Sequence, residues 1–126
     1  MNYKINEEPT IRVEAERYGV DWRFIAAIRR QEDGGPGREF GVLSEHAPDY
    51  NTQLSVCCES VAHRVFTYPG HPFVYTRHGL IYSYDWIKYF AGIWCPVGAT
   101  NDPDKLNVNW LPNVLKFYHQ YLAADS

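Results

Sequence analysis

Apolar residues recur at helical spacing along much of the chain, and the residues between them mark where helices begin and end. The first predicted helix covers residues 10–18, and Gly19 ends it. The second runs from residue 22 to residue 31 or 32 and begins after Asp21, a residue type that caps helix N-termini well. Its apolar side chains cover a broad face, as expected of a helix central to a small fold. The glycine- and proline-rich residues 34–37 then stop it.

Three further helices are predicted by the same pattern. One spans residues 52–66, and one spans residues 84–94 with Ser83 as its cap. The last begins at Asn109, which can cap it, and runs through residue 123 with apolar positions at i, i+3, i+4 and i+7. All three carry an apolar side, so each is expected to pack against a shared core.

The stretches between these helices are less regular. Residues 38–50 predict either a strand fragment or a packed loop. Residues 67–82 hold two prolines and two glycines among aromatics, which predicts an ordered loop with at most a short hairpin. No repeat or linker interrupts the chain, so one domain is expected over residues 1–126. The predicted fold class is mainly α, with about five helices and at most a small β hairpin.

The composition is that of an ordinary globular protein, with 45% hydrophobic and 21% charged residues. Aromatic residues reach 16%, and such side chains either fill a core or line grooves that bind sugars or peptides. The formal net charge of −3 counts against a nucleic-acid partner, which usually requires a basic face. It also disfavours electrostatic attraction to an anionic wall or membrane, so any such substrate must be held by a shaped groove.

No apolar run in the sequence is long enough to cross a bilayer, so membrane insertion is not expected. Residues 1–9 are polar and mixed in charge, unlike a secretory signal. The sequence therefore predicts synthesis in the cytoplasm without a signal peptide.

The cysteines and histidines do not form a recognisable metal motif. Cys57 and Cys58 are adjacent and Cys95 is distant, so buried thiols are expected rather than disulfides. The five histidines are scattered, and a zinc site would most plausibly involve His71 and His78. Neither spacing is typical of structural zinc, so no metal and no cofactor are predicted.

Glu32 continues the apolar stripe of the second helix, because it lies seven residues after Ile25 and four after Ile28. Partial burial and its place at the negative end of the helix dipole are both expected to raise its pKa. A carboxylic acid protonated near neutral pH is what cleavage of a glycosidic bond requires. Arg29 and Arg30 oppose this effect, and the alternative is a surface glutamate paired with one of them.

Residues 24–34, followed by Phe40-Gly41-Val42-Leu43-Ser44, resemble the catalytic core of the lysozyme superfamily. The similarity is to goose-type lysozymes and lytic transglycosylases, in particular compact phage endolysin-type members. In that family a buried helix ends in the catalytic glutamate, and a Gly-Leu-Met-Gln-like segment then lines the sugar groove. The resemblance implies a lysozyme-like single domain with Glu32 as the catalyst. It implies substrate contacts from Gly41, Val42, Leu43 and Ser44.

The sequence departs from the family pattern at Ser44, where the family usually has glutamine. Gln53, with Tyr50 before it, opens the next helix and is the expected alternative source of a substrate-binding amide. Aromatic residues beside the later loops are further candidates for stacking on sugars, and each of them can equally belong to the core: Tyr68, Tyr75, Tyr82 and Trp94.

The segment of residues 90–96, with Asn101-Asp102-Pro103 after it, resembles the closing segment of phage members of the superfamily. Trp94 and Asn101 are therefore expected to bind substrate. The alternative for Asn101 and Asp102 is a turn and cap that brace the last helix. The Ala-Tyr-Asn-x-Gly motif of larger lytic transglycosylases is absent from this sequence.

A single glutamate suffices for the reaction of a lytic transglycosylase. As the resemblance implies, it protonates the bond between N-acetylmuramic acid and N-acetylglucosamine, and the substrate's 2-acetamido group stabilises the cationic sugar. The glutamate then deprotonates the muramic 6-hydroxyl, which closes a 1,6-anhydro ring. A hydrolase would instead use a positioned water or a second carboxylate, with Asp49 the first candidate. Other candidates for that second group are Asp33, Glu39 and Glu45.

The expected partner is bacterial peptidoglycan, cut by a monomer that reaches the wall through holin- or phage-mediated release. Two other classes stay open. One is a lysozyme-like module that binds glycan, or serves in a phage particle, without cutting. The other is a helix-turn-helix regulator built around residues 20–33, which the acidic charge balance disfavours.

Overall fold

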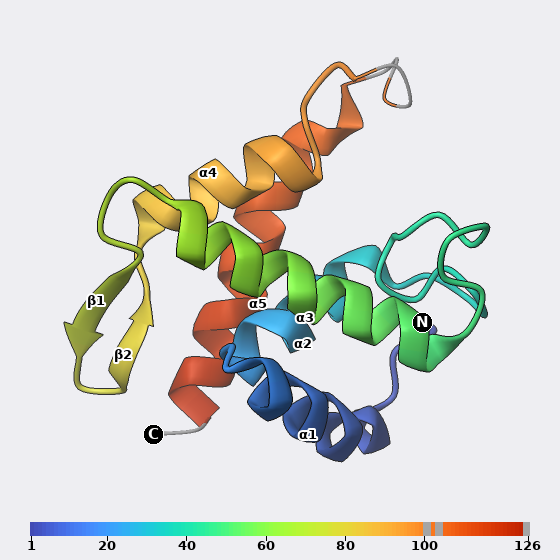
Figure 1. Cartoon of the computed structure of the whole chain (residues 1–126), viewed down its shortest axis with the longest axis horizontal. Helices are drawn as coiled ribbons and strands as arrows, with labels where there is room; N and C mark the ends of the chain where they lie inside the picture. The colour runs from blue at the N-terminus through green and yellow to red at the C-terminus, as the bar shows by residue number, and fades with distance from the viewer. Residues whose placement is uncertain (100–101, 103–104, 125–126) are drawn as a thin grey trace. The chain divides into compact units, whose positions relative to one another are not determined.

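The computed structural model describes residues 1–99, 102 and 105–124, which form a mainly helical fold with one small antiparallel hairpin (Figure 1). Within these residues there are five α-helices, so the predicted fold class is confirmed. The chain divides into two compact units, Met1–His63 and Arg64–Ser126, and each is described by itself. The single catalytic domain over residues 1–126 stays a prediction.

The first unit contains three α-helices that the sequence pattern predicted. After a short 3-10 helix, η1 (Ile5–Glu7), come α1 (Glu8–Tyr18), α2 (Trp22–Glu32) and most of α3 (Tyr50–Thr67). Gly19 ends α1 in the left-handed conformation, with φ of 69°. The Asp21 side chain accepts a hydrogen bond from the Arg23 amide at 3.1 Å and so caps α2.

Helix α2 lies at the centre of the first unit. Five consecutive apolar residues, at positions 24–28, are fully buried. Helix α1 packs against α2 and buries Ile11 and Ala15. Each large apolar side chain buried in this way contributes about 1.5–3 kcal/mol to stability. The broad apolar face expected of α2 is therefore what places its last residue, Glu32, at the edge of a rigid core.

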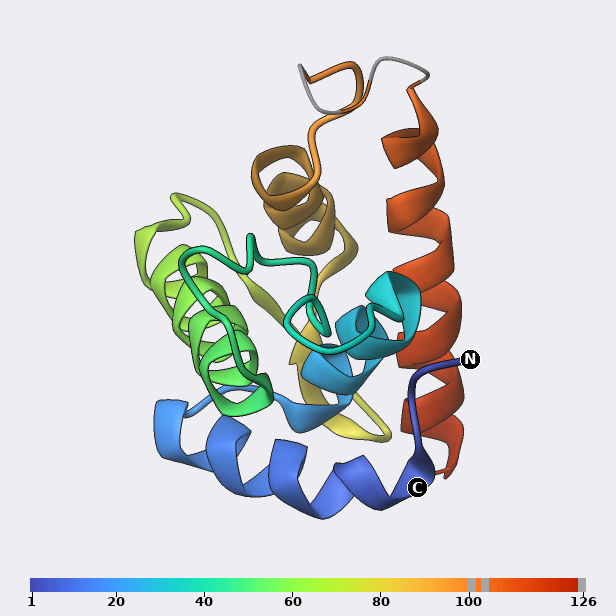
Figure 2. The same ribbon diagram turned by 90° about the vertical axis from the view of Figure 1, so that its right-hand side faces the viewer.

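Residues 33–49 connect α2 to α3 without any strand (Figure 2). Of the two predicted alternatives, the packed loop is the one observed. Phe40 and Ala47 from this loop are fully buried, so the loop adds apolar groups to the core of the first unit. We call residues 33–49 the α2–α3 loop because they connect these two helices.

The second unit begins with the end of α3 and continues into a hairpin. Its elements are β1 (Phe73–Thr76), β2 (Gly79–Tyr82), α4 (Tyr84–Trp94), η2 (Leu106–Asn109) and α5 (Trp110–Ala124). The strands pair antiparallel, with Phe73 opposite Tyr82 and Thr76 opposite Gly79. The Ser83 hydroxyl accepts from the Trp86 amide at 3.2 Å and caps α4, as predicted.

Aromatic side chains form the core of the second unit. Tyr82, Trp86, Phe90 and Trp94 stack in a row, with successive ring centroids 4.4, 5.4 and 5.5 Å apart. The Tyr118 hydroxyl on α5 accepts from the Tyr82 amide at 3.1 Å, and α4 packs against α5. Such pairs add about 0.5–1.5 kcal/mol each beyond area burial. Tyr82 thus belongs to the core, the second of its two predicted uses.

Candidate active site around Glu32

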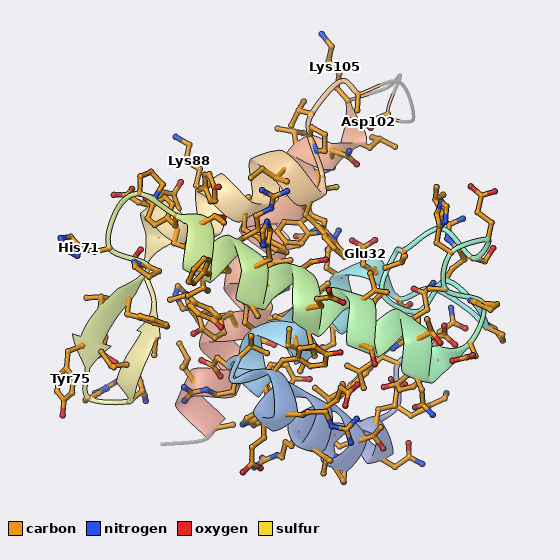
Figure 3. All side chains as sticks on the ribbon, viewed as in Figure 1. Glu32, His71, Tyr75, Lys88, Asp102 and Lys105 are labelled. Atoms are coloured by element: carbon orange, nitrogen blue, oxygen red, sulfur yellow. The ribbon has the colours of Figure 1, made fainter. Side chains whose placement is uncertain are left out.

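Glu32 is the last residue of α2, and its side chain is half-buried (Figure 3). Asp33 follows in the left-handed conformation, with φ of 44°, and its amide donates to the Arg29 carbonyl at 2.8 Å. The helix therefore ends abruptly, and the chain turns away immediately after the carboxylate. A glutamate in this place is held by the helix that precedes it and the loop that follows it.

Gly41 lies directly against the Glu32 carboxylate. A Cβ atom added to Gly41 would be 2.5 Å from Glu32 Oε1 and 2.6 Å from its Cδ, which is closer than real Cβ atoms approach. Gly41 also has a φ of +79°, a conformation that L side chains rarely adopt. The positive φ therefore favours glycine here, and a side chain at this position would also displace the Glu32 carboxylate. The glycine-led segment that follows α2 thus lies beside Glu32 in space, and its predicted contact with substrate stays a prediction.

Gln53 on α3 holds both neighbours of Gly41. Its side-chain Oε1 accepts from the Phe40 amide at 3.1 Å and from the Val42 amide at 3.2 Å. Its Nε2 donates hydrogen bonds at 2.8–2.9 Å to the carbonyls of Gly37, Val42 and Ala47. Gln53 is fully buried. The expectation that it binds substrate is therefore wrong, because its amide is already occupied in fixing the α2–α3 loop.

Arg29 fixes the start of the same loop. Its side chain is almost fully buried, and its Nη1 donates to the carbonyls of Gly34 at 3.1 Å and Glu39 at 3.0 Å. Its Nε donates to Glu7 Oε1 at 2.8 Å, which makes an ion pair. This residue was expected only as a possible partner of Glu32. Its place on the buried stripe, four residues after Ile25, is the sequence signal for the role observed.

The N-terminal residues bind the turn that follows Glu32. The amides of Asn2 and Tyr3 donate to Asp33 Oδ1 at 2.8 and 2.9 Å, and Asn2 Nδ2 donates to the Asp33 carbonyl at 2.7 Å. Slight burial would raise the pKa of Asp33, but these backbone hydrogen bonds outweigh it and lower the pKa. Asp33 is therefore engaged in structure, and no sequence feature had indicated this contact.

Tyr50 belongs to the network around Arg29. Its hydroxyl donates to Glu7 Oε1 at 2.8 Å, and its ring packs edge-on against Phe40 with centroids 5.7 Å apart. Burial, together with the hydrogen bond to Glu7, raises the pKa of Tyr50 far above its usual range. The hydroxyl is thus committed to a carboxylate inside the protein. The structure gives Tyr50 a bracing role in place of the predicted substrate contact.

Asp49 caps α3. Its Oδ1 accepts from the Thr52 amide at 2.8 Å and from the Thr52 hydroxyl at 2.9 Å, and the residue is exposed. The hydrogen bond from the Thr52 amide is the main reason why the pKa of Asp49 lies below its usual value. Glu39, another candidate second carboxylate, accepts from the Gly37 amide at 3.0 Å inside the loop. Both acids therefore have structural partners.

The remainder of the predicted groove segment faces outward. Val42 is half-buried, whereas Leu43 and Ser44 are exposed. On α3, Cys57 is fully buried and near enough to Glu32 to interact with it. Burial is the main cause that raises the pKa of Cys57, and the charge of Glu32 adds to it. The surroundings of Glu32 thus combine an exposed loop edge with a neutral thiol.

The later predicted contacts lie in the second unit. Trp94 is half-buried and stacks on Phe90, and its role toward substrate stays a prediction. Asn101 lies outside the described residues. Asp102 accepts from the Gly98 amide at 3.0 Å and from the Asn107 amide at 3.2 Å, so it braces the turn before α5. That matches the alternative given for Asp102, a cap rather than a ligand.

A cleft of about 580 Å³ lies on the first unit beside Glu7 and Arg29. Its lining includes Lys4, Gly35 and Asn51, but neither Glu32 nor the Gly41 segment. It is therefore separate from the carboxylate. Cys57, Cys58 and Cys95 are free thiols, and no cluster of three or more metal-ligating residues occurs in the part of the chain that is described. Within the same part, no helix is long and apolar enough to cross a membrane.

No protein-family model, curated protein or solved structure matched this chain.

Proposed function

We propose that the protein cleaves peptidoglycan glycan strands between N-acetylmuramic acid and N-acetylglucosamine, with Glu32 as the single acid and base. The main support is the position of the Glu32 carboxylate, at the end of a buried helix and in contact with Gly41. The resemblance of residues 24–44 to lysozyme-superfamily members points to the same pair. The hydrogen bonds that Arg29 and Gln53 make with the loop after Glu32 add support, since a catalytic group must be held in a fixed position.

In the proposed reaction, protonated Glu32 gives its proton to the glycosidic oxygen as the bond to the muramic C1 breaks. The substrate's 2-acetamido group stabilises the cationic sugar. The Glu32 carboxylate then takes the proton of the 6-hydroxyl, and that oxygen bonds to C1. The products are a 1,6-anhydromuramic end and a free N-acetylglucosamine end, and Glu32 is protonated again.

The surroundings of Asp49 favour this single-carboxylate reaction over a two-carboxylate hydrolysis. Asp49 is exposed and accepts two hydrogen bonds as a helix cap, so turning it toward a substrate would uncap α3. Loss of such a cap costs about 1 kcal/mol. A muramidase-type hydrolase that uses Asp49 is the second candidate, and a glycan-binding module without catalysis is the third.

The test is to incubate the purified chain with peptidoglycan sacculi and to identify released fragments by mass spectrometry. Wild type should release anhydro-muropeptides, and Glu32→Gln should lower the rate by about 10²–10⁴-fold, because it removes the proton donor. Glu59→Gln, at an exposed acid of the first unit that is assigned no role in the reaction, is the matched control and should retain the rate.

Three outcomes would contradict the proposal. Reducing-end products that disappear in Asp49→Asn would favour the hydrolase. Binding of sacculi without release by wild type would favour the binding module. Equal release by wild type and Glu32→Gln would remove Glu32 from the mechanism altogether.

A further inference from the structure

The negative net charge of the chain belongs to its first unit. Residues 1–63 contain seven Lys or Arg and eleven Asp or Glu, whereas residues 64–126 contain five and four. The first unit therefore carries a formal charge of −4 and the second a charge of +1, which together give the −3 of the whole chain. The expectation that this protein is not attracted to anionic surfaces holds for its average charge only.

The charge is most uneven around the hairpin. Residues 60–84 contain no Asp or Glu, but they include Arg64, Arg77 and three histidines. Arg77 is exposed in the turn between β1 and β2. In that turn the Thr76 hydroxyl accepts from the His78 amide at 3.0 Å and donates to the Gly79 carbonyl at 3.1 Å. A fixed turn thus presents a cation at the tip of the hairpin.

Several large apolar side chains of the same hairpin are exposed to solvent. Tyr75 is 82% exposed and Leu80, its cross-strand partner, is 60% exposed. Val74 is 45% exposed, and because it adjoins Tyr75 in the strand its side chain lies on the opposite face. Figure 3 shows Tyr75 pointing outward from the strand. Both faces of the outer half of the hairpin are therefore apolar and uncovered within the second unit.

The inner half of the hairpin is anchored. Phe73 stacks on Tyr82 with ring centroids 5.5 Å apart, and Tyr82 continues into the aromatic core through Trp86. The Tyr82 amide is held by the Tyr118 hydroxyl. The exposed tip is thus attached to a packed core of its own unit. An exposed apolar patch on a folded element of this kind indicates an interaction site.

We propose that the β1–β2 hairpin docks on the headgroup region of an anionic lipid bilayer. Interfacial binding uses exposed aromatic and aliphatic side chains together with cations, and the hairpin offers Tyr75, Leu80 and Arg77 in a stretch, residues 60–84, that contains no acid. A flat protein surface would cover only one face of the hairpin. A fluid bilayer interface surrounds a narrow tip and can cover Val74 as well as Tyr75 and Leu80. This proposal is independent of the function proposed for Glu32.

A glycan strand explains these residues less well. A sugar ring could stack on Tyr75, but it gains little from aliphatic Val74 and Leu80. A second copy of this chain is the other competitor, because its acidic first unit could attract the cationic tip. Each competitor predicts a different outcome in one experiment.

The test uses the full chain and sedimentation with vesicles of phosphatidylcholine alone or of equal parts phosphatidylcholine and phosphatidylglycerol. Wild type should bind the anionic vesicles at 50 mM salt and at least tenfold more weakly at 500 mM, because salt screens the charges. The double variant Tyr75→Ser/Leu80→Ser should weaken binding about tenfold or more, since apolar contact is lost. Arg77→Glu should weaken binding by at least about fivefold.

Matched controls come from exposed positions of α1. Val13→Ser removes a 63% exposed apolar side chain, and Arg17→Glu makes the same charge reversal as Arg77→Glu. Both should bind anionic vesicles like wild type. Circular dichroism verifies that each variant is folded, and the salt titration of wild type tests the proposal without any substitution.

Five results would overturn the proposal. Wild type that ignores anionic vesicles at 50 mM salt rules it out, as does equal binding to both vesicle types. Equal losses in the hairpin and control variants would make the effect nonspecific. Light scattering that shows a dimer dissolved by Tyr75→Ser/Leu80→Ser, without vesicle binding, would assign the hairpin to a second copy. Hairpin-dependent retention on sacculi, again without vesicle binding, would assign it to glycan.

Discussion

The α2–α3 loop, residues 33–49, and the β1–β2 hairpin are both short non-helical segments between helices, yet they are built in opposite ways. The loop is held by polar side chains that are buried, Gln53 and Arg29. The hairpin is held by a backbone ladder and by the contacts of Tyr82 with the aromatic core, while apolar Tyr75 and Leu80 stay exposed. Polar groups are inside in the first case, and apolar groups are outside in the second.

The difference shows how each segment serves a function. A buried polar group that satisfies several backbone groups fixes a loop in one conformation, because every lost hydrogen bond would leave an unpaired partner. That suits a loop that must hold Gly41 against Glu32. Exposed apolar side chains add little to folding and lower the free energy only when something covers them. That suits a contact surface.

The largest stability effect is expected at Arg29. Arg29→Met should lower the free energy of unfolding by about 3–5 kcal/mol, because it leaves Glu7 and two loop carbonyls without their buried partner. Arg17→Met is the control, since Arg17 is exposed and pairs with Glu14 on the surface. That change should cost at most about 1 kcal/mol in urea unfolding. Equal losses would mean that the buried hydrogen bonds of Arg29 do not stabilise the loop more than a surface ion pair would.

The Arg29–Glu7 pair also predicts acid sensitivity. Burial would raise the pKa of Glu7, but hydrogen bonds from Arg29, the Lys4 amide and Tyr50 outweigh it, and the pKa lies below 4.5. Its contribution to stability is therefore complete above about pH 4.5 and is lost as the pH falls through the lower folded-state pKa. Urea unfolding between pH 3 and 7 should show a smaller acid-side loss for Glu7→Gln than for wild type, and an unchanged slope would exclude Glu7.

A somewhat smaller loss is expected at Gln53. Gln53→Leu should lower the free energy of unfolding by about 2–4 kcal/mol, because it leaves the Phe40 and Val42 amides and three carbonyls unpaired. Asn51→Ala, at an exposed position of the same helix, should change it by less than about 0.5 kcal/mol. Hydrogen exchange should show the loop amides losing protection in Gln53→Leu alone. Full protection of these amides in Gln53→Leu would mean that the loop keeps its conformation without the Gln53 hydrogen bonds.

Gly41 and Gly79 separate backbone strain from contact with the carboxylate. Both have positive φ, +79° and +86°, but only at Gly41 would a Cβ meet Glu32. Gly41→Ala and Gly79→Ala should each cost about 1–2 kcal/mol in unfolding free energy, since both force an alanine into the left-handed region. Only Gly41→Ala displaces Glu32, and it should slow release from sacculi about a hundredfold. Equal activity of the two variants would mean that the loop does not position Glu32 for the proposed reaction.

The helices could be predicted from the sequence because their signals are local. Asp21 and Ser83 act as caps where expected, and the left-handed turn at Gly19 ends α1. Spacing within a helix determines which side chains are buried together, so Glu32 could be placed at the end of a buried stripe. The contact of Glu32 with Gly41 was not predicted, because no pattern in the intervening residues indicates it.

The hydrogen bonds that fix residues 33–49 could not be predicted, because each joins positions far apart in the chain. Gln53 lies 11 residues from Val42, and Asp33 lies 31 residues from Asn2. A glutamine on a helix face carries no local signal that distinguishes a buried clamp from a substrate ligand. The exposure of the hairpin could not be predicted either. The residue types of Tyr75 and Leu80 fit a half-buried strand, and only the structure shows that nothing in their own unit covers them.

The smallest effect is expected where the hairpin is most apolar. Tyr75→Ser/Leu80→Ser removes a cross-strand pair, and such pairs contribute about 0.2–1 kcal/mol. Because both side chains are mostly exposed, the free energy of unfolding should fall by less than about 1 kcal/mol in urea. Tyr82→Ser, on the same face but buried, is the contrast and should cost about 3 kcal/mol or more, since it opens the aromatic core. A large loss from the exposed pair would mean that these residues serve folding, and their exposure would then no longer point to a partner.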